Sequence, residues 1–189
     1  MARPATKTTE TARLEAGDWI LAGLAQLADQ GISGVKVETL AKRMGVTKGS
    51  FYWHFKDRET LLAAMLADWR RRATLDIIDR LDRSEGTPAE RLRRLLRLPM
   101  TGRASAWGAD VELSIRLWGR HDAAARAALE EVDQVRLRYI RGLLEGAGVP
   151  ADAVAARAVL AYSYMRVAGT LVGSHDAALM ARCEHHLFG

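Results

Sequence analysis

The chain has 189 residues, and its 28 basic and 23 acidic side chains give a formal net charge of +5. Hydrophobic residues make up 49% of the composition, which is enough for a buried core and excludes a largely disordered chain. The longest apolar stretch, 153–173, contains Arg157 and Arg166, which argues against a membrane span. We expect no signal peptide, because the first residues contain no apolar run. The single cysteine, Cys183, cannot form an internal disulfide, so we expect a reducing, cytoplasmic setting.

Helical periodicity runs through almost the whole chain, and no useful length shows strand alternation. The sequence therefore predicts an all-α protein with about nine helices. Gly31 and Gly45 are expected to end the first two helices, and Thr47, Asp57 and Asp122 are expected to cap later ones. We expect a loop at 99–105. The predicted helices are about 13–30, 37–44, 48–55, a long helix from 58 to about 83, 89–98, 106–118, 122–146, 151–172 and 175–187.

The segment 37–55 reads as a helix, a glycine-containing turn and a second short helix, which is the layout of a helix-turn-helix. The apolar side chains of this segment are expected to form a small core with the first helix. The outward side chains of the second helix suit DNA, so we predict that it enters the major groove. The core residues expected here are Leu40, Ala41, Met44, Val46, Phe51 and Phe55.

Each predicted DNA-binding residue has a chemical reason. Lys48 can donate to guanine, Gly49 permits close approach of the backbone, and Trp53 can pack on thymine methyl groups. Hydroxyl, imidazole and cationic side chains next to them can bind phosphate oxygens. A net charge of +3 on residues 1–58, which hold all five lysines, fits a polyanionic partner. The remaining predicted DNA-binding residues are Lys36, Thr47, Ser50, Tyr52, His54, Lys56 and Arg58.

These residues carry a resemblance to a known family. The run Gly45-Val-Thr-Lys-Gly-Ser-Phe-Tyr-Trp-His-Phe-Lys-Asp-Arg58, followed by Leu61-Leu62 and preceded by Leu40-Ala-x-x-Met44, resembles the DNA-binding signature of the tetracycline-repressor-like (TetR) family. The resemblance covers roughly residues 14–66. It implies a three-helix DNA-binding domain at 1–57 and a helical effector-binding and dimerisation domain at 58–189. It also implies a homodimer that binds a palindromic operator and releases it when a small molecule binds.

The second helix departs from the family pattern at its first position. The family usually has Thr or Ser at the N-cap, where this chain has Lys36, which cannot accept a hydrogen bond from a backbone N–H. Loss of a good cap typically costs about 1 kcal/mol of helix stability. Lys36 can instead reach a phosphate. Glu38 is expected to face DNA unfavourably unless it accepts from a cytosine amine.

Two functions are expected in the second domain. A largely apolar effector would be lined by aromatic and Met side chains, with Arg116 or Arg166 as a polar anchor, although each of these side chains suits an ordinary core equally well. By resemblance, the helices near 151–172 and 175–187 pair with those of a partner in a four-helix bundle; packing within one monomer is the alternative. The predicted effector residues are Trp69, Met100, Trp107, Trp118, Tyr162 and Met165.

Other readings of the chain are weaker. Cys183-Glu-His-His186 offers metal-ligating side chains but has no second cluster, so we expect neither metal nor cofactor. Arg70-Arg71-Arg72 is expected to be solvated or salt-bridged, because three consecutive residues lie on different faces of a helix. No catalytic motif is found, so we expect no enzyme. The sequence predicts a ligand-responsive repressor; an activator of the same fold and a sequence-nonspecific DNA-binding protein are the alternatives.

Overall fold

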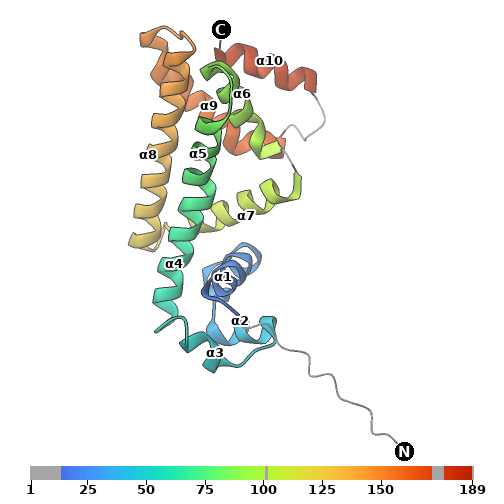
Figure 1. Ribbon diagram of the computed structural model, residues 1–189, viewed down its shortest axis with the longest axis vertical. Helices are drawn as coiled ribbons and strands as arrows, with labels where there is room; N and C mark the ends of the chain where they lie inside the picture. The colour runs from blue at the N-terminus through green and yellow to red at the C-terminus, as the bar shows by residue number, and fades with distance from the viewer. Residues whose placement is uncertain (1–13, 101, 172–176, 189) are drawn as a thin grey trace, which may run out of the picture.

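A computed structural model describes residues 14–100, 102–171 and 177–188, and they form helices joined by short connections (Figure 1). No strand is found in this part of the chain, and the all-α prediction is confirmed. The helices are α1 (Ala16–Gln30), α2 (Val37–Met44), α3 (Lys48–Tyr52), α4 (Arg58–Arg70), α5 (Asp76–Arg83), α6 (Pro88–Arg97), α7 (Gly102–Trp118), α8 (Ala123–Gly146), α9 (Ala151–Leu171) and α10 (Ala177–Phe188). Short 3-10 turns, η1 (Ile32–Gly34) and η3 (Leu98–Met100), and a π-helical turn, η2 (Arg71–Leu75), complete the order.

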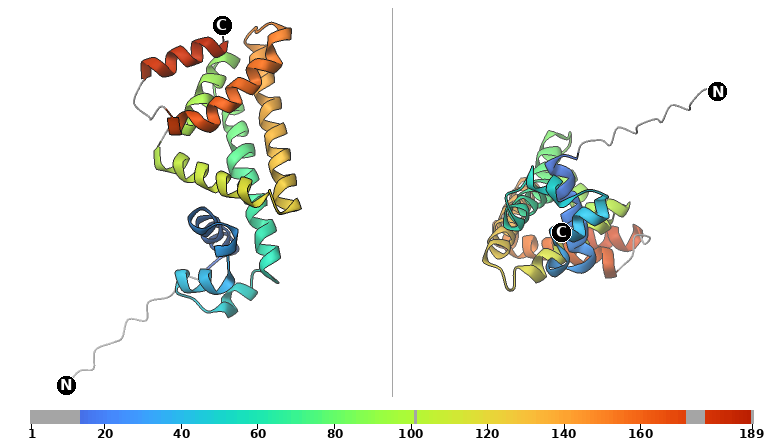
Figure 2. Two further views of the ribbon diagram at one scale, coloured as in Figure 1. Left: turned by 180° about the vertical axis from the view of Figure 1, so that it is seen from behind. Right: turned by 90° about the horizontal axis from the view of Figure 1, so that it is seen from below.

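Helices α4 and α5 are one long helix, because η2 continues the chain from one into the other without leaving helical geometry. Counted this way, the described residues contain nine α-helices, as predicted. Figure 1 and Figure 2 show α1–α3 as a small group at one end of the molecule. The long helix rises from this group beside α8, while α6, α9 and α10 lie at the other end and α7 crosses between them. The long helix therefore connects both ends.

Large apolar side chains hold α1–α3 on the start of the long helix. Trp19 of α1 meets Phe51 of α3 edge to face with ring centroids 5.3 Å apart, and Phe55 stacks on Phe51 at 5.5 Å. Leu61 and Met65 of α4 are buried in the same cluster. Burying each such side chain stabilises the fold by roughly 1.5–3 kcal/mol. This core spans residues on both sides of position 57, so packing is continuous where the sequence suggests a domain boundary.

Caps fix the ends of most helices where the sequence places them. The Asp57 carboxylate accepts from the Thr60 N–H at 2.8 Å at the start of α4, and Asp122 accepts from Ala125 N–H at 2.9 Å at the start of α8. Thr87 and Glu90 form a reciprocal capping box at the start of α6. Gly45 ends α2 in the left-handed conformation, with φ 68° and ψ 29°, which glycine adopts without steric cost.

Two predicted boundaries are wrong. Helix α3 ends at Tyr52 rather than at 55, because the N–H of His54 turns back to the Phe51 carbonyl in a tighter i+3 bond. The loop expected at 99–105 is shorter, because η3 occupies Leu98–Met100 and α7 begins at Gly102. A glycine at the first helical position does not interrupt a helix, since it precedes the interior where glycine is costly. Among the described helices, none combines the length and the hydropathy needed to cross a bilayer.

Candidate functional site

The helix-turn-helix places α3 at the free end of the molecule (Figure 1). Leu40 and Val37 of α2 face the core, and the tight turn after α2 is closed by a hydrogen bond from the Val46 N–H to the Ala41 carbonyl at 3.0 Å. Phe51 is completely buried and anchors α3 to the core. These contacts fix the direction in which the remaining side chains of α3 point.

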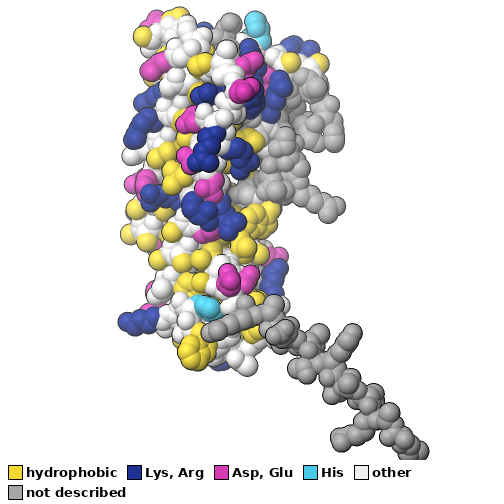
Figure 3. All heavy atoms as spheres, viewed as in Figure 1, with side chains coloured by type: hydrophobic (Ala, Val, Ile, Leu, Met, Phe, Trp, Pro, Cys, Tyr) yellow, Lys and Arg dark blue, Asp and Glu magenta, His cyan; other side chains and the backbone are white. Residues whose placement is uncertain are grey.

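The two aromatic side chains after Phe51 point outward. Tyr52 is 60% exposed and Trp53 is 83% exposed, the highest value among the exposed large hydrophobic side chains of the described chain. Figure 3 shows hydrophobic side chains in yellow gathered at this end of the molecule. Adjacent exposed aromatic rings are unusual on a protein surface and commonly mark a site of recognition. The phenol and indole also carry donors, which suits contacts with both base edges and phosphates.

Polar side chains surround the exposed rings. Ser50 and His54 are half-buried beside them, and the exposed members of this set are Lys36, Thr47, Lys48, Gly49 and Lys56. Thr47 stands at the N-cap position of α3, but its hydroxyl makes no capping hydrogen bond, so the predicted cap is wrong. The side chain of Lys36 likewise makes no cap bond to α2, as its chemistry predicts.

Gly49 lies on α3 at a place where the fold does not require glycine. A Cβ built on it would come no closer than 3.6 Å to another atom, the Thr47 Oγ1, which is an ordinary contact distance. Its φ is also not positive. Internal packing and backbone strain therefore do not require a glycine at this position.

Lys48 forms an ion pair with another residue of the surface around α3. Its Nζ lies 3.0 Å from the Glu38 Oε1, and both side chains are well exposed. A bond from the backbone N–H of Glu38, followed by the ammonium of Lys48, lowers the pKa of the Glu38 carboxyl. Helical spacing does not predict this pair, because the two residues are ten apart and lie on different helices. Lys48 thus offsets the unfavourable charge that Glu38 brings to this face.

Arg58 does not lie at the rim of this surface, contrary to the prediction. Its Nε donates to the Val35 carbonyl at 2.6 Å and one Nη donates to the Ile32 carbonyl at 2.9 Å. The guanidinium thereby joins the start of α4 to the segment before α2. Arg58 therefore holds the segment between α1 and α2 against the start of α4.

The predicted effector residues are not gathered around one cavity. Trp69 and Trp118 are buried in the core that also contains Trp19, whereas Met165 is buried in a second core at the far end. Tyr162 is half-buried, and Trp107 is 40% exposed. Met100 is part of η3, but its side chain lies outside the described residues.

A buried polar network lies between the two cores and joins four helices. Its centre is Glu112 of α7, whose side chain is 6% exposed. Glu112 accepts from Arg116 at 3.0 Å and from Arg136 of α8 at 2.9 Å, and it also pairs with Arg166 of α9. Arg116 holds Asp133 of α8 through two bonds of 3.0 and 2.7 Å. Arg116 and Arg166, the two proposed polar anchors, therefore lie in one cluster.

Tyr162 completes the network from α9. Its hydroxyl donates to Asp133 at 2.6 Å and accepts from Arg136 at 3.2 Å. The Arg166 guanidinium lies over the Tyr162 ring, 5.5 Å from the centroid. Burial by itself raises the pKa of Glu112, but Arg136 and Arg166 more than offset this and lower it to about 2. The carboxylate therefore stays ionised, as a buried acid can only when it is paired.

Arg136 also reaches the long helix at the π-helical turn. Its Nη2 donates to the Ala73 carbonyl at 2.9 Å and its Nε donates to the Thr74 hydroxyl at 3.1 Å. In this turn the Asp76 N–H bonds to the Arg71 carbonyl, five residues back, so the regular ladder is interrupted and a carbonyl needs an outside donor. The sequence did not predict Glu112, Asp133 or Arg136, because a charged side chain in a long amphipathic helix usually faces water.

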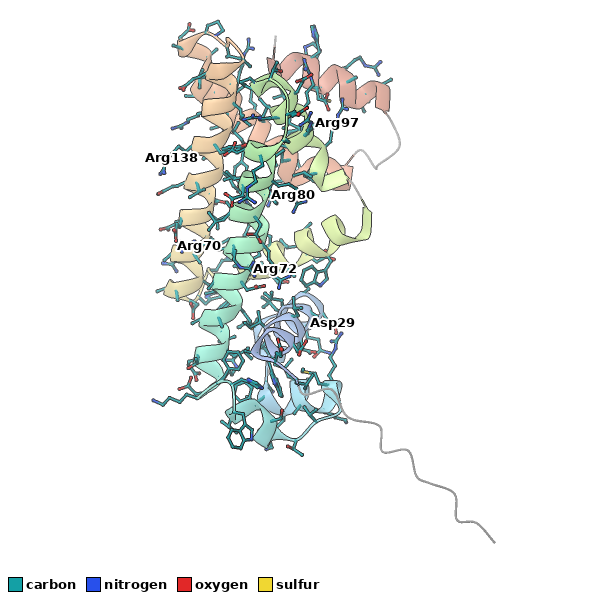
Figure 4. The ribbon with its side chains drawn as sticks, in the orientation of Figure 1. Asp29, Arg70, Arg72, Arg80, Arg97 and Arg138 are labelled. Atoms are coloured by element: carbon teal, nitrogen blue, oxygen red, sulfur yellow. The ribbon has the colours of Figure 1, made fainter. Side chains whose placement is uncertain are left out.

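The arginine run and the carboxyl-terminal cluster have ordinary partners. Arg70 pairs with Glu131 at 2.9 Å, and Arg71 and Arg72 each pair with Asp68 at 2.7 Å, so the salt-bridged interpretation is confirmed. Figure 4 shows Arg70 and Arg72 along the long helix and Arg97 near α10. Both oxygens of Glu184 accept from Arg97 at 2.7 Å. In the described part of the chain, no three His, Cys, Asp or Glu side chains are grouped as metal ligands would be.

Fold and surface together define a class: an all-α protein with an amino-terminal helix-turn-helix domain. Residues 20–65 match the model of a family described as bacterial regulatory proteins, tetR family. SrpR of Pseudomonas putida, an HTH-type transcriptional regulator, is 34% identical over 76 residues, which are 40% of this chain and 34% of that protein. AcrR of Shigella flexneri, also an HTH-type regulator, is 36% identical over 59 residues, or 31% of this chain and 27% of that protein. The chain thus matches only about a third of the length of these relatives.

Solved structures resemble the chain over nearly its whole length. A transcriptional regulator of Saccharomonospora viridis in complex with choline has a TM-score of 0.73 at 14% identity, and the match covers 91% of this chain and 92% of that one. FadR of Bacillus subtilis in complex with stearoyl-CoA has a TM-score of 0.68 at 19% identity, covering 93% and 98%. At such identities the likeness shows the fold. Residues 20–65 of the chain thus match the tetR family model, and the chain as a whole shares its fold with these solved structures.

Proposed function

We propose that the protein is a transcriptional repressor that binds a palindromic DNA operator as a homodimer in the cytoplasm and leaves it when a small molecule binds. The observation that carries this proposal is the pair Tyr52 and Trp53, largely exposed to solvent at the end of a short helix whose Phe51 is fully buried. The family match over residues 20–65 covers this same segment. Exposing two aromatic rings to water is unfavourable, and their exposure is explained if DNA covers them.

The outward face of α9 supports the homodimer. Its exposed residues between positions 155 and 163 are apolar or small and carry no charge: Ala155, Ala156, Val159, Leu160 and Ser163. Leu160 is 59% exposed and Val159 is 51% exposed. A stripe of this kind on a surface helix is what a helix-to-helix interface buries. Two copies joined here would present two α3 helices to one duplex, as a palindrome requires.

Two features support control by a small molecule. Structural neighbours were solved with choline and with stearoyl-CoA, so proteins of this fold accept ligands of different chemistry. In this chain the long helix packs on α1 near its start and is bound by Arg136 of the buried network further along. A ligand that binds one arrangement of α7–α9 better than another would move the start of α4 and with it the spacing of the two α3 helices.

The test is operator binding by single variants, with a duplex obtained by selection from random sequences. We expect Tyr52→Ala and Trp53→Ala each to weaken binding at least tenfold in a gel-shift titration, since each removes contacts to base edges or phosphates. Leu113→Ala, at a leucine of α7 that is 58% exposed, is the control and should bind as the unaltered protein does. Unchanged affinity in both aromatic variants contradicts the assignment of this surface.

A further inference from the structure

The buried network contains more positive than negative charge. Three arginines, Arg116, Arg136 and Arg166, share two carboxylates, those of Glu112 and Asp133. The charged residues around it on the long helix are paired elsewhere, as Arg70 is with Glu131 and Arg72 with Asp68. Tyr162 supplies a neutral hydroxyl that is already donated to Asp133. Within the described residues the cluster is therefore one acid short.

The excess positive charge is located at Arg166. Arg136 has all three nitrogens occupied, and Arg116 holds Asp133 through both terminal nitrogens. Arg166, by contrast, pairs with Glu112 through Nη1 while its Nε is buried and has no hydrogen-bond partner. Its side chain is still 29% exposed, so this side of the network can be reached from solvent. A buried donor without a partner is unfavourable, and more so when it is charged.

We infer that this cluster is the polar end of the effector site and that the effector is an anion, with a carboxylate or phosphate group bound by Arg166. The inference rests on the proposed function and names the class of small molecule it takes. An acidic group beside Arg166 supplies the missing negative charge and accepts from the unpaired Nε. A guanidinium binds such groups through two parallel hydrogen bonds, which makes the contact both strong and directional. A cationic or neutral ligand would leave the excess charge in place.

The position of the anion also connects it to the DNA-binding end. Arg166 and Arg136 bind the same carboxylate, that of Glu112, and Arg136 holds the π-helical turn of the long helix through Ala73 and Thr74. An anion that draws Arg166 away from Glu112 changes the interactions of Arg136. Arg166 is thus linked through Glu112 and Arg136 to the long helix, whose start packs against α1.

The experiment measures thermal shifts of the full chain with benzoate and octanoate, each compared with its primary amide at equal ionic strength. We expect the acids to raise Tm in a saturable way and the amides to leave it unchanged, because binding to the native state stabilises it. In Arg166→Gln the apparent Kd for the acids should rise at least tenfold, as expected when a charge-assisted contact is lost. Arg141→Gln, an exposed arginine on α8, is the matched control and should respond as the unaltered protein does.

A second measurement does not depend on the acid or amide that is added. Because Arg166 carries the excess charge, Arg166→Gln should lower the Tm of the unliganded protein by far less than Glu112→Gln, which leaves the three arginines with one acid. Equal responses to acid and amide, or a response that Arg166→Gln retains, would overturn the inference. A protein that selects a DNA sequence but fails this test keeps its proposed function, whereas one that responds to acids but selects no DNA keeps the anion site and loses the proposed function.

Discussion

At the scale of single residues, the surface around α3 balances its charges internally. Lys48, one of the proposed DNA-binding residues, is paired with Glu38 at 3.0 Å. An exposed ion pair of this kind contributes little to stability, typically about 0–1 kcal/mol. If this surface binds DNA as proposed, the Glu38 carboxylate would repel phosphates and occupy the ammonium that would otherwise meet them.

We therefore predict that Glu38→Gln strengthens binding to DNA of random sequence and makes it more sensitive to salt. Releasing one lysine for a phosphate adds about 0.9 to the slope of log affinity against log salt for each protomer. Titrations of a fluorescent duplex at several salt concentrations measure this slope. Glu130→Gln makes the same charge change on the exposed face of α8 and should leave it unaltered. An unchanged slope in Glu38→Gln would show that the pair has no part in DNA binding.

The sequence predicted the positions of residues better than their contacts. Apolar spacing identified Phe51 and Phe55 as core and left Tyr52 and Trp53 outside, because alternation of faces is encoded locally in α3. Arg58 follows the same local logic and was assigned to the rim, yet it binds carbonyls more than twenty residues away. Contacts between residues so far apart in the sequence depend on how the helices pack. The periodicity of apolar residues carries no information about that packing.

At the scale of elements, the long helix is the part that the sequence predicted least completely. Its start at Asp57 and its end near Ser84 follow from capping chemistry and are confirmed. The π-helical turn at Arg71–Leu75 was not expected, because it is stabilised from outside by Arg136 and not by its own residues. The widened turn lies in the long helix, and the arginine that donates hydrogen bonds to it lies on α8. These hydrogen bonds form only when α8 packs against the long helix.

Removing Arg136 should therefore cost stability. We predict that Arg136→Met lowers the free energy of unfolding by about 3 kcal/mol, since it leaves the Glu112 carboxylate short of a partner and the Ala73 carbonyl without a donor. Thr74→Val keeps the shape, loses one neutral hydrogen bond, and should cost only about 1 kcal/mol. Urea unfolding at equal protein concentration compares the two variants. Equal losses would mean that the arginine contributes no more than one ordinary hydrogen bond.

At the scale of the whole molecule, one long helix joins the two ends and α9 presents an apolar face outward. The first core ties α1–α3 to the long helix, and the second core packs α6, α8 and α9 at the far end. The outward face of α9 belongs to neither core. The sequence predicted pairing of this helix only through the family resemblance, because a helix buried in a monomer core shows the same apolar spacing.

Assembly through this face predicts a clear effect of charge. Leu160→Asp should convert the protein to monomers at micromolar concentration, because a buried interface does not tolerate two unpaired carboxylates near its axis. Sedimentation equilibrium gives the mass directly. Leu113→Asp places the same charge at a leucine of almost equal exposure on α7, 58% against 59%, and should leave the mass unchanged. A Leu160→Asp protein that keeps the mass of the unaltered chain would place any interface elsewhere.

The central claim is that two copies of α3 read one duplex together, and selection from random duplexes tests it most directly. Sequencing of the bound DNA should reveal an inverted repeat whose half-sites lie one helical turn, about 10 base pairs, or a multiple of it apart. Each duplex should carry an even number of protomers, and Trp53→Ala should recover no enriched sequence. Enrichment of a lone half-site, or of no sequence at all, would contradict the account.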